Sequence, residues 1–307
     1  MGLLTTGVSG ISGRRVHVES QAKVRHGERR AGRPDRGGLL LTAVVWIGAA
    51  IMLVPVVWMG LTSLKPQSEI LQQVPTFLPK HPTFDAYTTV LTDPDNPLLT
   101  YFANSVVVAG TVTVSVLFTS TLAGYVFAKF RFFGRGLIFV LVLSSLMVPA
   151  QAIVIPLYLT VRTTGLLNTL WALILPNMVS GFGVYLMKQY IEGLPTSVIE
   201  AARIDGASEF SIYRRIILPQ VRPALAALGI FTFKWMWNDY LWPLFAINDT
   251  AHSTLGLGIA NYASGQHGTE YNLTLAVATL SALPLIAVFV IFQKQFVEGI
   301  AISGLKG

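Results

Sequence analysis

The stretch that decides the fold is Leu194-Pro-Thr-Ser-Val-Ile-Glu-Ala-Ala-Arg-Ile-Asp-Gly-Ala-Ser208, which continues through Arg214-Arg215 to Leu218-Pro219. The stretch is polar, and apolar runs long enough to span a membrane flank it on both sides. Charged side chains are costly in hydrocarbon, so a segment this polar between two spans must lie in water at a membrane surface.

Local signals predict that a first short helix begins near the start of this stretch. Ser197 and Glu200 have the spacing of a capping box, in which the hydroxyl and the carboxylate satisfy free backbone N–H groups. Pro195, just upstream, suits the first turn of a helix. Gly206 is a natural left-handed stop, because glycine adopts positive φ without a steric cost.

A second short helix is predicted to follow. Ser208 can cap its start, and we expect it to end before Pro219, because proline disfavours helix in the residue that precedes it. The small pair Ala201-Ala202 lets another surface approach the backbone of the first helix closely. The alternative interpretation is a cytoplasmic helical hairpin with no special role.

The order of residues here resembles a known motif. Glu-Ala-Ala, three residues, Gly, nine residues, Ile, one residue and Leu-Pro is the pattern of the EAA loop of ATP-binding-cassette (ABC) importer permeases. It is met by Glu200-Ala201-Ala202, Gly206, Ile216 and Leu218-Pro219. The resemblance implies that the loop forms coupling helices that dock into a cleft on an ATPase subunit. The coupling residues would be Glu200, Ala201, Ala202, Asp205, Gly206, Ala207, Leu218 and Pro219.

Composition points to an integral membrane protein. Hydrophobic residues make up 52% of the 307 residues and charged residues only 12%, against about 25% charged in a soluble domain. We expect an all-α membrane protein with six transmembrane helices and a cytoplasmic coupling-helix loop. The net charge of +7 does not indicate nucleic acid, because the positive charge lies in loops and in a tail. The absence of cysteine excludes disulfides, thiolate metal sites and cysteine nucleophiles.

The chain divides into a tail and a membrane domain. Residues 1–38 contain eight basic residues and have no apolar periodicity, so we interpret them as a disordered cytoplasmic tail that is solvated or attracted to anionic lipid. We expect residues 39–307 to form the six-span permease domain that the resemblance implies, with the coupling loop at 191–222. The six apolar runs are about 39–62, 102–127, 137–159, 167–187, 223–246 and 273–293.

The distribution of lysine and arginine predicts the orientation. Eighteen of these residues fall on the side that holds both termini and the Glu-Ala-Ala loop, and only Lys65, Lys80 and Arg162 fall on the other. By the positive-inside rule both termini are cytoplasmic in a multi-pass protein of the cell (plasma or inner) membrane. The long loops 63–101 and 247–272 then lie outside, where they are either docking sites for a partner or ordinary linkers.

No residue pattern in the sequence indicates catalysis. The histidines fall in segments that we predict to be aqueous, and no phosphate-cradling G-x-x-x-x-G-K-[ST] motif occurs. We therefore expect no catalytic residue and no metal site, and we do not expect an enzyme.

The fifth span is unusual because it carries ionisable and aromatic residues together. Lys234 and Asp239 each cost roughly 2.5–3.5 kcal/mol on insertion scales, and such groups usually face a water-filled cavity or a partner. Aromatic rings near amides and carboxylates are typical of sugar binding. The alternatives are an aromatic belt at the outer interface and binding of a neighbouring helix by Asn238 and Asp239. The candidate substrate-pathway residues are Lys234, Trp235, Trp237, Asn238, Asp239 and Trp242.

The same span narrows the resemblance. Trp-Asn-Asp-Tyr-Leu-Trp-Pro-Leu at 237–244 resembles the fifth-span signature of carbohydrate-uptake ABC permeases, the smaller permease of the maltose importer among them. Residues 147–176 and the ending at 296–307 agree with this likeness, which covers nearly everything from residue 40 onward. Lys234 departs from the family, which usually has an apolar or small residue there, and so does the long basic tail.

The resemblance implies a sugar importer assembled from several subunits. The partners would be a second permease subunit, two ATPase subunits, an extracytoplasmic sugar-binding protein and the lipid bilayer. No cofactor would bind this chain, since ATP and Mg would bind the ATPase subunits. One alternative is the same machine importing a polyol, glycerophosphodiester, phosphate or amino acid. A secondary transporter or membrane enzyme is another, but it predicts ionisable groups in several spans.

Overall fold

The computed structural model describes residues 36–264 and 270–304, and the side chains of 40–264 and 270–293. Every regular element in these ranges is a helix, which confirms the predicted all-α class. The expected tail, residues 1–38, lies outside the described residues except for 36–38, which begin the first helix.

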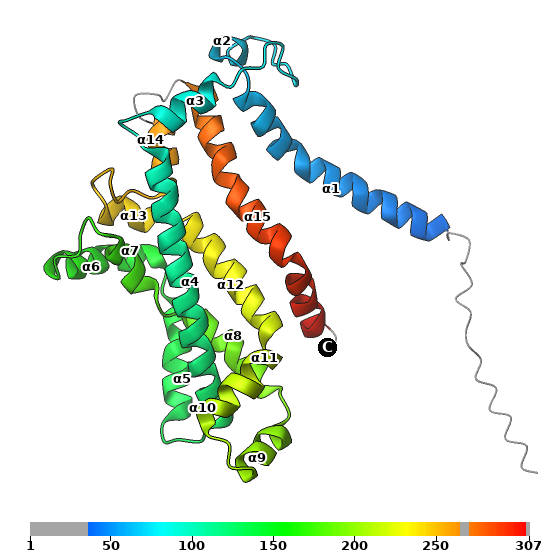
Figure 1. Ribbon diagram of the computed structural model, residues 1–307, viewed down its shortest axis with the longest axis vertical. Coiled ribbons are helices and arrows are strands. Elements are labelled where there is room, and N and C mark those ends of the chain that lie inside the picture. The colour runs from blue at the N-terminus through cyan, green and yellow to red at the C-terminus, as the bar shows by residue number, and fades with distance from the viewer. Residues whose placement is uncertain (1–35, 265–269, 305–307) are drawn as a thin grey trace, which may run out of the picture. The chain divides into compact units, whose positions relative to one another are not determined.

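The α-helices follow one another along the chain with short connections (Figure 1). They are α1 (Arg36–Ser63), α2 (Gln67–Ile70), α3 (Asp85–Thr92), α4 (Leu98–Lys129), α5 (Arg135–Ser144), α6 (Ala150–Thr163), α7 (Leu170–Ile174), α8 (Gly181–Glu192), α9 (Thr196–Ile204), α10 (Glu209–Ile212), α11 (Leu218–Gln220), α12 (Arg222–Trp237), α13 (Leu241–Ala246), α14 (Leu255–Ser264) and α15 (Tyr271–Gly304). Three short non-α turns are 3₁₀ at Ser145–Met147 and Leu175–Asn177 and π at Tyr213–Ile217.

Internal contacts divide the chain into two units at Leu53 and Val54. The described part of the first unit is the beginning of α1, whose side chains are exposed from Leu40 onward. The second unit, Val54–Gly307, contains the buried core and both candidate functional regions.

Four helical segments in the described chain are long and apolar enough to cross a membrane, and two bent pairs raise the number to as many as six. The four are Leu40–Ser63, Leu98–Lys129, Leu170–Glu192 and Tyr271–Gln293. They coincide with the first, second, fourth and sixth apolar runs of the sequence. The third run and the start of the fifth are where the bends occur.

The third apolar run is not a straight helix. Its two limbs, Arg135–Met147 and Ala150–Thr163, meet at an angle of 101°. Val148 is extended, with φ −83° and ψ 117°, because the ring of Pro149 disfavours helical backbone in the residue before it. Figure 1 shows α6 leaving the direction of α5 at this point.

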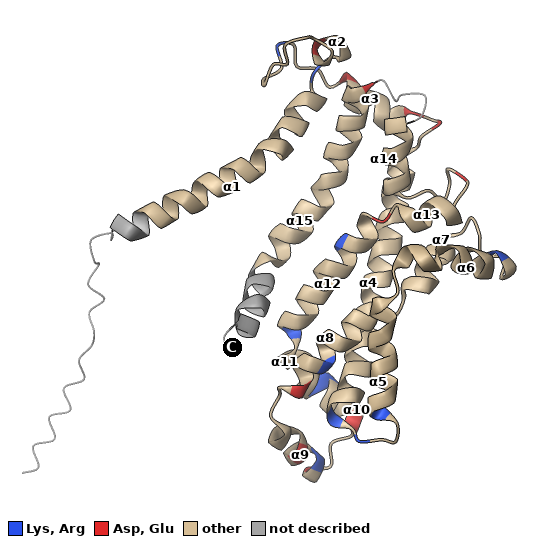
Figure 2. Cartoon of the chain, turned by 180° about the vertical axis from the view of Figure 1, so that it is seen from behind, with Lys and Arg blue, Asp and Glu red and all other residues tan. Residues whose placement is uncertain are grey.

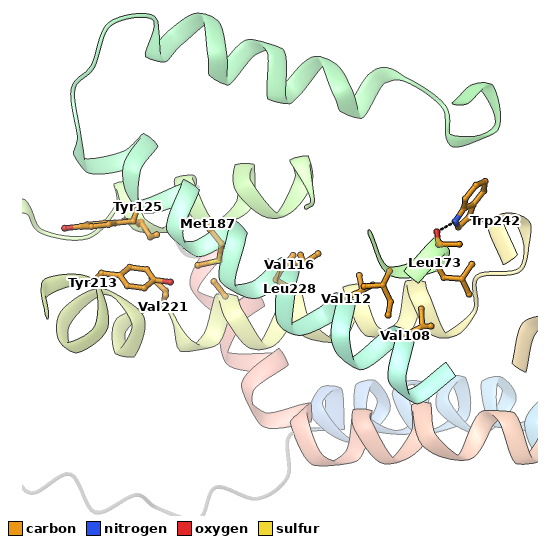
Figure 3. Packing of buried hydrophobic residues seen from close by; sticks show 14 of the residues in the cluster. Val108, Val112, Val116, Tyr125, Leu173, Met187, Tyr213, Val221, Leu228 and Trp242 are labelled. Carbon is orange, nitrogen blue, oxygen red and sulfur yellow. Dashed lines mark hydrogen bonds between the residues drawn. The ribbon is translucent and has the colours of Figure 1, made fainter. Parts of the chain in front are cut away.

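The main core forms where α4 packs along α8 and α12 (Figure 3). Val116 of α4, Met187 of α8 and Leu228 of α12 are all at most 1% exposed. Glycines allow the close approach of the first two helices, because a Cβ on Gly124 would stand 2.8 Å from the Cβ of Met187. The contact surface between α4 and α8 therefore has no room for a larger residue at position 124.

A second buried cluster joins α3 and α14 to the other end of α4 and to α15. Tyr101 and Tyr262 are its largest fully buried side chains. The hydroxyl of Tyr262 donates to Asp93 at 2.9 Å, which ties α14 to the loop before α4. Helix α4 therefore contributes buried residues to both clusters.

The loop after α1 is closed by a buried carboxylate. Glu69 is 4% exposed and accepts hydrogen bonds from the hydroxyl of Thr76 at 2.9 Å and the backbone N–H of Lys80 at 3.0 Å. The ammonium of Lys65, also buried, donates to the carbonyl of Thr76. The N–H of Lys80 is the main cause that lowers the pKa of Glu69 below its ordinary 4.5, with Thr76 and Lys65 adding to it and burial opposing.

Glu69→Gln is expected to open this loop. An amide presents two donors to the N–H groups that the carboxylate now accepts from, so hydrogen exchange at Lys80 should become several-fold faster. Because the pKa of folded Glu69 is lowered, the protection should hold above pH 4.5 and be lost as pH falls through the folded value. Hydrogen exchange with mass spectrometry measures this. Asp95→Asn, an exposed carboxylate in the loop before α4, is the control, and equal exchange in both variants contradicts the role.

Candidate functional site

The first predicted coupling helix, α9, ends at Gly206 as expected. Gly206 has φ +77°, and the N–H of Ala207 reaches back to the carbonyl of Ala202 at 2.9 Å. The N–H of Gly206 also donates to the backbone carbonyl of Arg203 at 3.1 Å. This arrangement is the Schellman ending of a helix, in which a left-handed residue satisfies the last free carbonyls.

The predicted capping box at Ser197 and Glu200 is wrong. α9 begins at Thr196, and the residue before it, Pro195, has φ −58° and ψ 123° and takes the N-cap position. Ser197 therefore lies inside the first turn and Glu200 in the second, too late to serve as its cap. Proline brings the helix start forward because its φ is already fixed near the helical value.

The second helix begins as predicted but does not end before Pro219. The hydroxyl of Ser208 accepts from the N–H of Ser211 at 3.3 Å and caps α10. A π-helical segment, Tyr213–Ile217, then leads into α11, in which Pro219 is near the first position. A proline in the first turn of a helix loses no hydrogen bond, so the new start at Leu218 accommodates it. α11 then ends at Val221, where the helical path bends by 77° into α12.

The eight predicted coupling residues divide into an outward and an inward set. Ala202, Ala207 and Leu218 are half-buried and pack against the main core. The outward set is exposed: Glu200, Ala201, Asp205, Gly206 and Pro219. Ile199 and Ile212 anchor the two short helices in the same core. The loop therefore presents one surface for a partner while its other side is part of the permease body.

Two exposed apolar side chains belong to the outward surface and were not predicted. Ile204 is 86% exposed and Phe210 is 68% exposed, on either side of the Gly206 turn. The sequence signal that could have identified them is a pair of large apolar residues in a segment too polar to span. Apolar side chains held in water beside a turn of this kind are typical of a protein contact surface.

A polar cluster, which we term the Glu209 bracket, joins the loop to the end of α4. The hydroxyl of Tyr125 donates to Glu209 at 2.7 Å, and Nε of Arg203 donates to its other oxygen at 2.7 Å. The guanidinium of Arg203 lies 5.6 Å from the ring centre of Phe130, which meets Tyr125 edge to face. The Glu209 bracket consists of Tyr125, Phe130, Arg203 and Glu209, from α4, the residue after it, α9 and α10.

Electrostatics hold the bracket in its charged form. The hydrogen bond from Arg203 is the main cause that lowers the pKa of Glu209 below its ordinary value; the Tyr125 hydroxyl adds to this and partial burial opposes it. Nearby, Nζ of Lys129 donates to the carbonyl of Leu194 at 2.7 Å, at the start of the loop. Figure 2 shows that basic residues gather at this end of the second unit, around α9, α10 and the start of α5.

The fifth apolar run is broken near the middle of its polar stretch. α12 ends at Trp237, and α13 begins only at Leu241. The amide of Asn238 donates to the carbonyl of Lys234 at 2.8 Å, which satisfies the end of α12. Asp239 is half-buried and faces the backbone N–H groups at the start of α13. A break of this kind within membrane depth is tolerated when side chains satisfy the freed backbone groups.

The rings of Trp237 and Trp242, which were predicted to stack on a sugar, are buried within the protein. Their assignment to the substrate pathway is therefore corrected. Trp237 is 3% exposed, and its ring lies against Phe102 and Phe233 while its N–H donates to the carbonyl of Ser281 at 3.1 Å. Trp242 is also buried, and its N–H donates to Ala172 at 2.9 Å (Figure 3). Residues of the protein itself, most of them distant in the sequence, supply the contacts that the sequence pattern attributed to a sugar.

Three of the four remaining candidates of the fifth run are exposed, Asp239 being half-buried. Lys234, Trp235 and Asn238 are exposed, and the ring of Trp235 is 73% exposed. Lys234 and Asn238 stand four residues apart and share a side of α12, as the spacing predicts. The structure therefore leaves Lys234, Trp235 and Asn238 accessible near the end of α12 and buries Trp237 and Trp242.

These features define a class: a multi-span, all-helical membrane protein with a structured loop of two short helices at one end. Comparison with known proteins gives the family. Residues 115–302 match the family model described as "Binding-protein-dependent transport system inner membrane component". The chain belongs to that family.

The relatives agree with this assignment. The chain is 36% identical over 272 residues to the arabinooligosaccharides transport system permease protein AraQ of Bacillus subtilis, covering 88% of this chain and 96% of AraQ. It is 32% identical over 277 residues to the diacetylchitobiose uptake system permease protein NgcG of Streptomyces coelicolor, covering 89% and 91%. A solved bacterial ABC transporter involved in alginate import has the same fold, with a TM-score of 0.74 at 24% identity over 85% of this chain and 96% of its own.

The chain is therefore a multi-pass inner-membrane permease subunit of a binding-protein-dependent ABC importer. Members of this family form the membrane path and are not themselves catalytic, which confirms that the chain is not an enzyme. The predicted relationship to carbohydrate-uptake permeases is also confirmed by these relatives.

Proposed function

We propose that this chain is half of the translocation path of a sugar or oligosaccharide importer and that its Glu-Ala-Ala loop couples the path to ATP hydrolysis. The observation that carries the coupling role is the division of the loop into two sides. Glu200, Asp205 and Gly206 are exposed, whereas Ile199 and Ile212 are buried in the same core as α4, α8 and α12. A push on the exposed side is therefore applied to the permease body and not to a free loop.

The substrate class rests on the relatives and on the end of α12. AraQ and NgcG are named for arabinooligosaccharides and diacetylchitobiose, and the exposed Trp235 stands beside polar Lys234 and Asn238. The partners would be a second permease subunit, two ATPase subunits that bind ATP and Mg, and an extracytoplasmic sugar-binding protein. No cofactor would bind this chain, and the basic residues 1–38 would lie in the cytoplasm.

The experiment that tests the substrate class uses the whole complex. The permease pair, ATPase subunits and binding protein are reconstituted in proteoliposomes, and ATPase stimulation is screened across sugars, polyols, glycerophosphodiesters and amino acids. Stimulation by one sugar or oligosaccharide supports the proposal. Stimulation only by a non-sugar keeps the machine and changes its cargo, and stimulation by none of them contradicts the proposal.

Orientation gives a separate prediction. Both termini are expected in the cytoplasm, because the basic end of the second unit holds the coupling loop, which must meet a cytoplasmic ATPase. A phosphatase or fluorescent reporter fused after Gly307 should report a cytoplasmic location. A reporter placed in the outer segment near Asp95 serves as the opposite control, and an active periplasmic phosphatase after Gly307 overturns the orientation.

Trp235→Ala is expected to lower sugar transport and leave the complex assembled. The indole is 73% exposed and makes no part of the buried core, so its removal costs little stability. Trp237→Ala is the contrasting variant: it removes a buried ring and should reduce the yield of folded complex, since such truncations cost about 3–5 kcal/mol. Transport and yield are measured side by side. Normal transport by Trp235→Ala removes it from the proposed sugar route.

A further inference from the structure

We propose that Glu209, acting through Arg203 and Tyr125, fastens the coupling helices to the end of α4, so that α4 moves with the loop. This inference rests on the coupling role proposed above and names the residues that transmit it within the permease. They are positioning residues, because they touch one another and not the substrate.

The coupling loop is attached to the permease body at several points. The chain itself ties the loop to α8 at one end and to α12 at the other, where it bends by 77° at Val221. Apolar packing of Ile199 and Ile212 in the main core also holds the loop, but such packing is not directional. Glu209 adds a directional attachment, since its carboxylate accepts a hydrogen bond from the hydroxyl of Tyr125 of α4 at 2.7 Å.

The bracket also joins the two coupling helices to each other. Glu209 begins α10 and Arg203 is in the last turn of α9, on opposite sides of the Gly206 turn. Their ion pair of 2.7 Å closes that turn with side chains. A force on either helix is therefore delivered to the same carboxylate.

A second link between the loop and α4 lies beside the Glu209 bracket. Beside this attachment, the hydroxyls of Tyr213 and Thr121 lie 2.9 Å apart, which is a second and fully buried link between the loop and α4. α4 packs along α8 and α12 through the main core. Movement of the bracket is consequently passed to the helix at the centre of the second unit, in addition to α12.

The exposure of the ion pair separates a positioning role from a stabilising role. The side chains of Arg203 and Glu209 are 37% and 43% exposed, and ion pairs this exposed contribute little to folding. If the bracket had only a structural role, breaking it would therefore change the stability and the transport of the complex very little. A positioning bracket changes how much solute crosses for each ATP hydrolysed, even in a complex that is fully assembled.

The test measures that ratio in proteoliposomes containing the complete transporter, with ATPase co-purification as the check on assembly. Glu209→Gln should lower solute transported per ATP by about fivefold, the factor that corresponds to one net hydrogen bond. Arg203→Glu should lower it at least as much, because it places two carboxylates together. The double variant Arg203→Glu, Glu209→Arg should regain most of the ratio of solute transported per ATP, since it restores the ion pair with reversed sign and the Tyr125 hydroxyl can accept a hydrogen bond from the new guanidinium.

Glu192→Gln is the matched control. Glu192, the last residue of α8 at the edge of the loop, is 45% exposed, and its ion pairs are with Lys188 of α8 at 2.6 Å and Arg135 of α5 at 3.9 Å, so neither pair includes a residue of α9 or α10. The solute transported per ATP by Glu192→Gln should equal that of the unmodified transporter. The inference fails if Glu209→Gln and Arg203→Glu keep the normal ratio, or if the reversed pair regains nothing. If Gly206→Val loses coupling while the Glu209 and Arg203 variants keep it, the proposed function stands and the role of the Glu209 bracket is wrong. If Gly206→Val also keeps normal coupling, the proposed coupling function and the role of the bracket are both wrong.

Discussion

Gly206→Val is expected to abolish coupled transport while the binding protein still binds its sugar. Gly206 has φ +77°, and no described atom lies within 4 Å of the position that a Cβ would occupy. The penalty is thus conformational: a side chain in left-handed backbone costs roughly 1–2 kcal/mol, and a β-branched one more. Relaxing that strain would rotate α9 against α10 and move the exposed surface at Glu200 and Asp205. Transport and ATPase stimulation in the reconstituted complex measure the effect.

Gly134→Val is a close control for that experiment. Gly134 also has φ +77° with no described atom near its missing Cβ, and it lies in the turn between α4 and α5, outside the loop. The same strain is therefore introduced at both positions. A loss confined to Gly206→Val supports a coupling role, equal losses attribute the effect to strain alone, and normal transport by Gly206→Val contradicts the role.

Gly124→Ala is expected to lower the stability of the complex by forcing α4 and α8 apart. The added methyl group would stand 2.8 Å from the Cβ of Met187 and 2.9 Å from the backbone nitrogen of Lys188. Neither atom is the end of a flexible side chain, so α4 and α8 must separate. Overpacking of this kind costs typically 1–3 kcal/mol, and the apparent melting temperature of the purified complex should fall.

Gly110→Ala provides the control on the same helix. No described atom lies within 4 Å of its missing Cβ, and alanine favours helix over glycine by up to about 1 kcal/mol. The melting temperature should therefore stay the same or rise. A fall of equal size in both variants would show that the loss at Gly124 comes from the helix itself and not from its contact with α8.

The sequence predicted the parts of this fold that depend on local chemistry. The Gly206 stop and the Ser208 cap were correct, because each needs only one residue type at one place. The start of α9 was not, because Pro195 and Ser197 both signal a helix start and the sequence does not rank them. The continuation through Pro219 depends on a π-helical segment that no sequence spacing announces.

Long-range packing explains the other differences. Trp237 and Trp242 carry the same sequence pattern whether they face a sugar or a neighbouring helix, and only Ser281 and Ala172, distant in the chain, decide between them. The Glu209 bracket was not predicted for the same reason, since Tyr125 is 84 residues from its partner. Hydropathy predicted six apolar runs, and the described chain has four helices long enough to span a membrane, or up to six if each bent pair is one span. It contains no information on the bends.

The bend at Val148 and Pro149 affects how the chain is made. Each limb of the third apolar run has 13 or 14 helical residues, about 20 Å of helix, whereas the hydrocarbon core is about 30 Å thick. Neither limb can leave the insertion machinery as an independent rod. Since α5 packs on α8 and α6 on α13, both made later, we expect this run to be integrated only after its C-terminal neighbours emerge from the ribosome. The order of integration would then differ from the order of synthesis.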